Sequence, residues 1–330
     1  MLLLTDDEVR ACLPMDQLVD ALRDGYRIEA DGGVQLPDRV NLAARPGFFR
    51  LMPAVVGGAD VMGFKVFNQV SAGGVQYLIG LYDEGSGELL AQLDGAYLTA
   101  ARTGAATGVA AGLLGPRGPV EVGLIGSGLE AETNLAGTCA ALDVTSVAVF
   151  SPHPERRERF ARRMTERLGI PVVPVDTAEQ AASAAVVVVA TNTGMGTGRV
   201  ALRGKWLSPG ATVLSIGSTM PELRELDVEV MDRARLVVSD APEQARGESG
   251  DLIAADEAGA LSGKLRSLAE LAAPTAHRAP REHPADIAVY KSVGTALQDL
   301  IAARLVYEHA RTAGTGIDVD LLRVKKPAGS

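Results

Sequence analysis

The sequence predicts an α/β protein with two parts: a doubly wound parallel sheet of the Rossmann type, and an α+β part that precedes it. Three observations support this fold class. Residues 34–93 contain short apolar runs separated by glycine-rich turns. Residues 120–240 alternate apolar strands with helical spacers, and the first of those strands runs into a glycine-rich turn. Such alternation is typical of parallel sheets, in which a crossover helix follows each strand.

Composition limits the classes of function. The 330 residues are enough for two hydrophobic cores. The 41 acidic residues exceed the 32 basic ones, and the net charge of −9 argues against a nucleic-acid or anionic-membrane surface. Cys12 and Cys139 are too few for a disulfide framework, and the four histidines fit no metal site. The N-terminus turns acidic after four residues and so lacks the apolar core of a secretory signal. We therefore predict a soluble, cytoplasmic protein, and we expect no metal.

The first part is predicted to begin with helices. Thr5 and Glu8 have the spacing of a capping box, and Pro14 begins a second helix. One face of that second helix carries Leu18, Leu22 and Tyr26. Further elements are predicted as strands within 48–56, 61–70, 76–83 and 88–95, a hairpin loop at 83–88 and an alanine-rich helix at 96–115.

The second part is predicted from its apolar runs. Strands are expected within 120–126, 144–151, 172–175, 184–191, 212–218 and 234–240. The helix that follows the second strand spans 154–169. We also expect one helix near 262–272 and a final helical run over 285–314.

The turn after residue 125 has the pattern G-x-G-x-x-A, formed by Gly126, Gly128 and Ala131. The first glycine permits a tight turn, the second lets a pyrophosphate approach the backbone, and the small third residue lets the helix pack on the strand. Because the turn joins a strand to a helix and a second strand follows, we interpret it as a dinucleotide site. The alternative is an ordinary glycine-rich turn of an α/β protein.

The second strand ends without the acidic residue that binds a free ribose 2′-hydroxyl. Four polar or basic residues that could bind a 2′-phosphate stand there instead, namely Ser151, His153, Arg156 and Arg157. The sequence therefore favours NADP over NAD, with NAD still possible. Alternatively, the arginines only solvate the start of an exposed helix.

Five blocks, in the same order along the chain, together resemble the ornithine cyclodeaminase/mu-crystallin family: "GFKVFNQV", "GELLAQLDGAYLTAARTGAATG", "GLIGSGLEA", "SIGSTMPELRELD" and "YKSVGTALQDL". The resemblance implies a two-domain, homodimeric oxidoreductase that moves a hydride between nicotinamide and the α-carbon of an amino or imino acid. It places the substrate-binding and dimerisation domain at 1–116, joined by a C-terminal helix at about 297–330. The Rossmann domain would then be 117–296.

The resemblance also implies which residues hold the substrate carboxylate: Arg39 in "LPDRV", Lys65 and Arg102. Lys65 lies in an apolar run, where an ammonium without a partner is costly, so an external carboxylate is its candidate partner. Arg50 is a fourth candidate. The alternatives are a surface turn for Arg39, a helix-surface ion pair for Arg102, and a lysine that snorkels to water for Lys65.

One departure from the family concerns Thr219, which stands where the deaminating members carry an aspartate. A threonine hydroxyl can form a hydrogen bond but cannot act as a base near neutral pH. This favours a ketimine reductase or amino-acid dehydrogenase over an ornithine or lysine cyclodeaminase. Glu222, Asp227 or a proton from the solvent could take the place of the missing carboxylate. A non-catalytic protein that binds NADPH and a small ligand is the alternative of another class.

The resemblance and the glycine-rich pattern together give the remaining site residues. Lys65 and Thr219 would be catalytic, and Val293 would contact the substrate. The residues expected at the cofactor are Arg102, Thr103, Gly126, Gly128, Leu129, Glu130, Ser151, His153, Arg156, Thr191 and Ser292.

Overall fold

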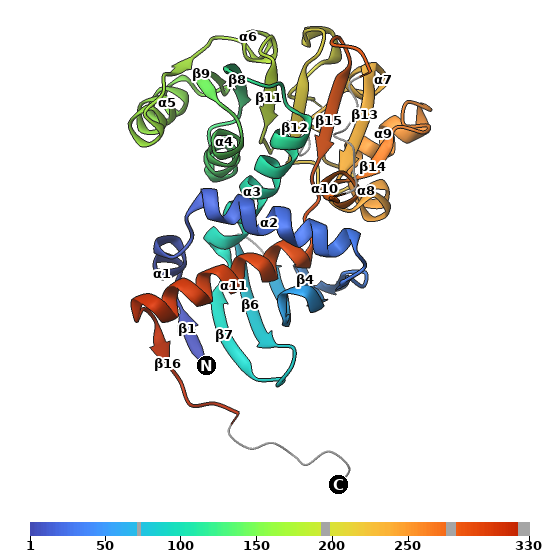
Figure 1. Cartoon of the computed structure of the whole chain (residues 1–330). Coiled ribbons are helices and arrows are strands. Elements are labelled where there is room, and N and C mark those ends of the chain that lie inside the picture. The colour runs from blue at the N-terminus through green and yellow to red at the C-terminus, as the bar shows by residue number, and fades with distance from the viewer. Residues whose placement is uncertain (71–73, 193–198, 275–281, 323–330) are drawn as a thin grey trace.

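The computed structural model describes residues 1–70, 74–192, 199–274 and 282–322. It contains two eight-stranded sheets, one built mainly from the first hundred residues and one from the rest of the chain (Figure 1). This is the predicted α/β fold class, with a parallel Rossmann-type sheet and a second, mixed sheet. Within the described ranges, no helix is both long and apolar enough to cross a membrane.

The N-terminal sheet has the strand order β16-β1-β7-β6-β5-β4-β2, and β3 pairs with β4. Its strands are β1 (Leu2–Leu4), β2 (Val34–Gln35), β3 (Val40–Ala44), β4 (Gly47–Val56), β5 (Val61–Val70), β6 (Val75–Asp83), β7 (Leu89–Asp94) and β16 (Ile317–Asp318). The four predicted strands and the hairpin loop before residue 89 are confirmed. Strand β1 was not predicted, because a three-residue strand has too short a pattern to recognise.

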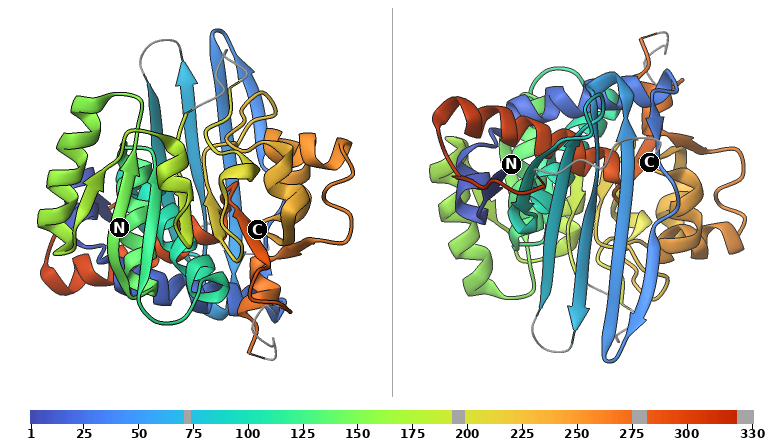
Figure 2. Two further views of the ribbon diagram at one scale, coloured as in Figure 1. Left: turned by 90° about the horizontal axis from the view of Figure 1, so that it is seen from above. Right: turned by 90° about the horizontal axis from the view of Figure 1, so that it is seen from below.

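Two long helices cover one face of this sheet. Helix α2 (Met15–Ala30) follows Pro14 as predicted and buries Leu18, Leu22 and Tyr26, while α1 (Asp6–Ala11) begins with the predicted capping box. Helix α11 (Ala296–Ala313) returns from the end of the chain and packs on β4, β5, β6 and α2. Figure 2 shows α11, in red, running across the side-by-side strands. A short 3-10 turn, η1 (Gly57–Ala59), precedes β5.

The second sheet is parallel in all its pairings, in the order β10-β9-β8-β11-β12-β15-β13-β14. Its strands are β8 (Val120–Ile125), β9 (Val144–Phe150), β10 (Val172–Pro174), β11 (Val186–Val189), β12 (Thr212–Ser215), β13 (Ala234–Ser239), β14 (Leu265–Ser267) and β15 (Ile287–Lys291). Its helices are α4 (Leu129–Ala141), α5 (Pro154–Leu168), α6 (Ala178–Ala182), α7 (Val228–Arg233), α8 (Pro242–Glu248), α9 (Gly250–Glu257) and α10 (Leu268–Ala272), with a 3-10 turn η3 (Gly204–Trp206).

Two sequence predictions in this part need correction. The final helical run over 285–314 is wrong at its start, because Ile287–Lys291 form strand β15 between β12 and β13. All five residues are buried, and a short run buried on both faces cannot be told from a helix segment by its periodicity. The helix expected near 262–272 is shorter than predicted, because Leu265–Ser267 form β14 and only Leu268–Ala272 are helical.

Helix α3 (Ala96–Leu114) lies between the two sheets and is buried over most of its length. It packs against α4 through glycines. A Cβ on Gly104 would lie 2.1 Å from the Thr133 carbonyl oxygen, and a Cβ on Gly137 would lie 1.9 Å from the Gly104 carbonyl oxygen. The two helix backbones are therefore in direct contact. This contact fixes where α3 presents Arg102 and Thr103.

We expect Gly104→Ala to destabilise the protein, because the added methyl group meets backbone atoms that cannot move aside; overpacking of this kind costs about 1–3 kcal/mol. Gly112→Ala in the same helix is the matched control, since its Cβ meets Ala141 Cβ at an ordinary 3.8 Å. Thermal unfolding should show a lower Tm for Gly104→Ala only. Equal melting temperatures for the two variants would contradict direct backbone packing.

Candidate functional site

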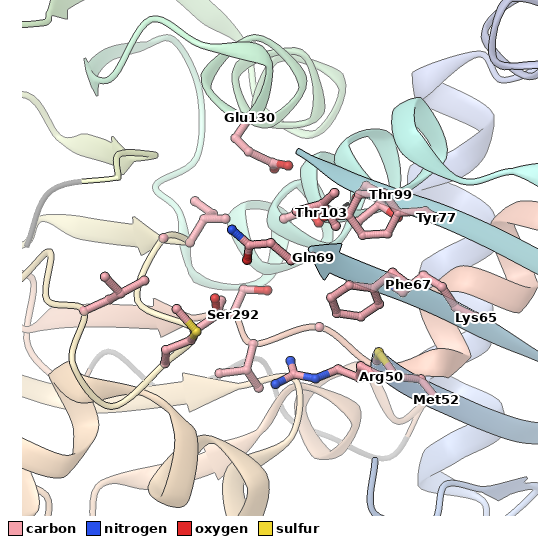
Figure 3. A pocket seen from close by; sticks show the side chains of 18 of the residues that line it. Arg50, Met52, Lys65, Phe67, Gln69, Tyr77, Thr99, Thr103, Glu130 and Ser292 are labelled. Carbon is pink, nitrogen blue, oxygen red and sulfur yellow. Dashed lines mark hydrogen bonds between the residues drawn. The ribbon is translucent and has the colours of Figure 1, made fainter. Parts of the chain in front are cut away.

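A cavity of about 340 Å³ lies between the two sheets. Its walls come from β4, β5 and β6, from α3, from the start of α4, and from the segments that follow β11, β12 and β15 (Figure 3). In parallel α/β sheets, ligands bind at the carboxyl ends of the strands, which is where these segments stand. Among the described residues, no group of three or more His, Cys, Asp or Glu side chains could hold a metal ion.

Alternating residues of three antiparallel strands form the floor of the cavity. In the sheet, Lys65 of β5 lies opposite Met52 of β4. Phe67 of β5 lies between Arg50 of β4 and Tyr77 of β6. Because successive side chains of a strand point to opposite faces, residues two apart share the cavity face. The Phe67 ring stacks on Tyr77 with centroids 5.1 Å apart. The strand pattern thus places a lysine, an arginine and aromatic rings on one surface.

Lys65 is 2% exposed and already has a partner within the chain. Its Nζ lies 2.9 Å from Oδ1 and 2.8 Å from Oδ2 of Asp299, which α11 supplies. Lys65 is therefore not a buried ammonium without a partner, and its binding of an external carboxylate stays a prediction. Burial lowers the pKa of Lys65 to about 7, although Asp299 opposes that shift. A lysine with such a pKa can exchange a proton near neutral pH.

Arg102 shares the same carboxylate. Its Nε donates to Asp299 Oδ1 at 2.9 Å, and its Nη1 donates to the Gln298 side-chain oxygen at 2.6 Å. The Asp299 carboxylate thus joins β5, α3 and α11 in one buried ion triad. Two cations share one carboxylate, so the triad has one positive charge that Asp299 does not balance. Sequence reasoning missed Asp299; the available signal was an acid in the buried first turn of α11.

Arg39 reaches the cavity from the loop before β3. Its Nη2 donates to the carbonyl oxygens of Gly294 at 2.7 Å and Val293 at 3.3 Å, and its Nη1 lies 3.1 Å from Glu248 Oε2. Asp240 holds this turn, because its carboxylate accepts hydrogen bonds from the backbone N–H groups of Val293 and Gly294, both at 2.9 Å. The structure therefore brings Arg39, Lys65 and Arg102 to one cavity.

The glycine-rich turn has the geometry that the sequence predicts. Gly126 has φ +134°, and a Cβ there would lie 2.2 Å from the Ala190 carbonyl oxygen. Gly128 faces open space, which leaves its backbone accessible. Leu129 is 42% exposed beside it. Glu130 points into the cavity near Thr103, and burial is the main cause of its raised pKa (Figure 3).

Of the four residues expected at a 2′-phosphate, two are exposed after the end of β9 and two are buried. His153 and Arg156 are exposed. Ser151 is buried and its Oγ accepts a hydrogen bond from Ser127 Oγ at 3.0 Å. Arg157 is engaged, because its guanidinium donates to Asp176 Oδ1 at 3.1 Å and to the Ser151 carbonyl oxygen at 3.3 Å.

Thr191, Thr219, Ser292 and Val293 line the cavity from the parallel sheet. Thr191 donates to Glu225 through its backbone N–H at 2.6 Å and through its hydroxyl at 2.8 Å. The other oxygen of Glu225 accepts hydrogen bonds from the backbone N–H groups of 216 and 217. Sequence reasoning missed this role of Glu225, which holds together the segments after β11 and β12.

Neither carboxylate that could replace the family aspartate lines the cavity. Asp227 instead caps α7 and accepts a hydrogen bond from the Gly204 N–H at 2.9 Å. Glu222 is exposed. Among the described residues that line the cavity, Glu130 carries the one carboxyl group.

Comparison with known proteins shows similarity along nearly the whole chain. The chain is 29% identical to an alanine dehydrogenase of Archaeoglobus fulgidus over 98% of this chain and 99% of that protein. It is 32% identical to the ketimine reductase mu-crystallin of Mus musculus over 84% of this chain and 86% of that protein. Its structure resembles that of Thermococcus litoralis Δ1-pyrroline-2-carboxylate reductase in complex with NADH and L-proline, with a TM-score of 0.89. The two sequences are 29% identical, and the match covers 97% of this chain and 100% of that one.

The family model for the ornithine cyclodeaminase/mu-crystallin family matches residues 1–314, so the resemblance inferred from five short blocks extends over both sheets and the cavity between them. The chain belongs to the ornithine cyclodeaminase/mu-crystallin family.

Proposed function

We propose that this protein is an NAD(P)-dependent oxidoreductase, a ketimine reductase or amino-acid dehydrogenase that acts at C2 of a small α-imino or α-amino acid. One observation carries the proposal: the cavity lined by Lys65 and Arg102, which share Asp299, also reaches Glu130, in the first turn of the helix that follows the glycine-rich turn. A nicotinamide cofactor supplies or accepts the hydride when bound. The similarity to an alanine dehydrogenase and to ketimine reductases supports this reaction class.

The glycine-rich turn would hold the cofactor pyrophosphate, with Gly126 making the turn and Gly128 leaving the backbone accessible. Leu129, Glu130 and Thr103 stand around this turn, and Thr191 and Ser292 would flank the nicotinamide. Ser151, His153 and Arg156 would receive a 2′-phosphate, so we propose NADP as the preferred cofactor.

The positive charge that Asp299 leaves unbalanced on Lys65 and Arg102 would bind the substrate carboxylate. Arg39 would add a donor, because its buried Nε makes no hydrogen bond within the described structure. Holding the carboxylate beside Val293 fixes the angle between C2 and the nicotinamide. In the reductive direction the C=N π bond breaks, C2 gains the hydride and the nitrogen gains a proton. Lys65 can supply that proton, and the Thr219 hydroxyl can hydrogen-bond to the nitrogen.

We also propose a division into a substrate-binding and dimerisation domain, 1–116 with the segment from about 297, and a Rossmann domain, 117–296. The last residues of that segment, 323–330, lie outside the described residues. A homodimer is proposed because a similar archaeal alanine dehydrogenase forms a dimer. The two free cysteines, Cys12 and Cys139, are consistent with the cytoplasmic location we propose.

The reaction is tested by adding pyrroline- or piperideine-2-carboxylate, or pyruvate with ammonia, to protein and NADPH. Loss of the reduced-nicotinamide absorbance is expected. Lys65→Ala should weaken substrate binding by about a hundredfold, since it removes a charged partner from a buried site. Its cofactor Kd should stay nearly unchanged. The exposed Lys205→Ala variant is the control.

Three outcomes would change the proposal. Equal loss of substrate and cofactor affinity in Lys65→Ala would make the lysine structural. Retained NADPH binding without turnover of any substrate would favour a non-catalytic binding protein. Conversion of ornithine to proline with release of ammonia would favour a cyclodeaminase.

Affinity for a simple carboxylate should depend on pH. Lys65, with its pKa of about 7, is a cation below that pH and becomes neutral above it. The inhibition constant of propionate should therefore be lowest below pH 7 and rise as the pH increases above 7. Lys65→Arg should flatten this profile, because a guanidinium stays charged. Glu130→Gln is the control, and it should keep the slope. A slope that persists in Lys65→Arg would assign the titration to another group.

Cofactor preference should depend on Arg156. Removing one charged contact to a phosphate is expected to weaken NADPH binding by about tenfold or more. Arg156→Ala should do so while the Kd of NADH stays unchanged, as measured by fluorescence titration. Arg159→Ala, an exposed arginine one turn further along α5, is the matched control. An unchanged NADPH affinity in Arg156→Ala would mean that this arginine only solvates the helix.

A further inference from the structure

Arg50 differs from the other cations that line the cavity. Lys65 and Arg102 share Asp299, and Arg39 contacts Glu248 and two carbonyl oxygens. The Nε of Arg50 donates to the side-chain oxygen of Asn41. Its two terminal guanidinium nitrogens make no hydrogen bond or ion pair with any residue that the structure describes.

Aromatic rings hold the Arg50 guanidinium in place. Its Cζ lies 5.4 Å from the ring centroid of Phe48 and 5.4 Å from that of Phe67, and those two rings meet edge to face. A guanidinium fixed against rings presents its terminal nitrogens in a defined plane, which matches the geometry of a carboxylate. Burial is the main cause of the lowered pKa of Arg50, and this indicates partial removal from water. An anion in the cavity would offset that loss of hydration.

Arg50 and Lys65 stand at separate points on the same sheet face. Arg50 is opposite Phe67, and Lys65 is opposite Met52, so the two are diagonal neighbours, about 7–8 Å apart at their backbones. In Figure 3 both approach the cavity from the sheet, while Glu130 approaches from the opposite side. The cavity thus carries positive charge at two separate points, the ion triad and Arg50, and no described carboxylate forms an ion pair with Arg50.

We propose that Arg50 binds a second, side-chain carboxylate of the substrate, so that the substrates are α-imino or α-amino dicarboxylic acids. This inference rests on the proposed oxidoreductase function and specifies its substrate class. The α-carboxylate occupies the charge at Lys65 and Arg102, and the distal carboxylate meets the terminal nitrogens of Arg50. Arg50 takes no part in the hydride or proton transfer and selects the substrate through its charge.

The test compares 2-oxo acids of matched length in the presence of ammonia and reduced cofactor. Oxaloacetate and 2-oxoglutarate are the dicarboxylic acids, and 2-oxobutyrate and 2-oxopentanoate are the monocarboxylic ones. Wild-type protein should favour the dicarboxylic acids in kcat/KM. Arg50→Gln should lower kcat/KM for them by roughly ten- to hundredfold and leave the monocarboxylic acids within about threefold. Arg50→Lys should keep part of the preference, because it retains the charge.

The control is Arg203→Gln, which removes an exposed arginine stacked over Trp206 at 5.7 Å, outside the cavity. It should change neither class of substrate, and melting temperatures verify that each variant is folded. Equal loss of both classes in Arg50→Gln would assign Arg50 to the α-carboxylate and overturn the inference. A wild-type preference for monocarboxylic acids would also overturn it.

The inference can fail while the proposed function holds, since turnover of the monocarboxylic acids tests the function by itself. If no 2-oxo acid is turned over, the inference is tested by measuring how tightly succinate and butyrate bind to the protein–NADPH complex. Tighter binding of succinate that is lost in Arg50→Gln supports the second carboxylate site. Equal binding of the two acids overturns it.

Discussion

The ion triad of Lys65, Arg102 and Asp299 is the interaction on which the cavity depends. It joins a strand, a helix and the returning C-terminal helix. Asp299 lies 234 residues after Lys65 and 197 residues after Arg102 in the chain. Removing Asp299 would leave two buried cations without compensation, and a loss of this kind costs about 3–5 kcal/mol. The triad therefore fixes the arrangement of these three elements. Because Asp299 compensates only one of its two partners, the same contact leaves the positive charge that an anionic ligand needs.

Polar contacts extend from the triad to both sheets. Gln298 accepts a hydrogen bond from Arg102 and donates to Tyr26 at 2.7 Å and to Asp240 at 2.9 Å. Asp240 in turn orders the turn whose carbonyl oxygens bind Arg39. One connected network thus sets the position of each cation proposed to hold the substrate carboxylate. In a buried site such a network is rigid, because an unpaired polar group there is costly.

Local patterns predicted most of the fold, whereas most of the candidate site residues came from the family resemblance and their roles stay predictions. The strands before residue 96 and the glycine-rich turn depend on neighbouring residues, and Lys65 stood out because its immediate surroundings are apolar. Asp299 and Glu248 were missed, since their partners are distant in sequence; the only local sign of Asp299 is its place in the buried first turn of α11. Strand β15 was mistaken for helix, because five buried residues carry no periodicity that separates the two. Arg157 matched the expected residue type, but its contact with Asp176 is a tertiary feature.

The placement of charge explains why one cavity can serve two different ligands. The proposed cofactor side would offer the backbone N–H groups of the glycine-rich turn, the start of α4 and hydroxyl groups, which suit a pyrophosphate and an amide. The proposed substrate side carries the cations, which differ in their direct contacts. Arg39 is paired with Glu248, and Lys65 and Arg102 share one carboxylate. Arg50 contacts rings and an amide, and Glu248 acts on it only through its charge. An incoming anion is stabilised most by the cation whose charge is least compensated by neighbouring carboxylates. Selectivity among substrates would then depend on two features: the cations that line the cavity, and the lack of a described carboxylate in direct contact with Arg50.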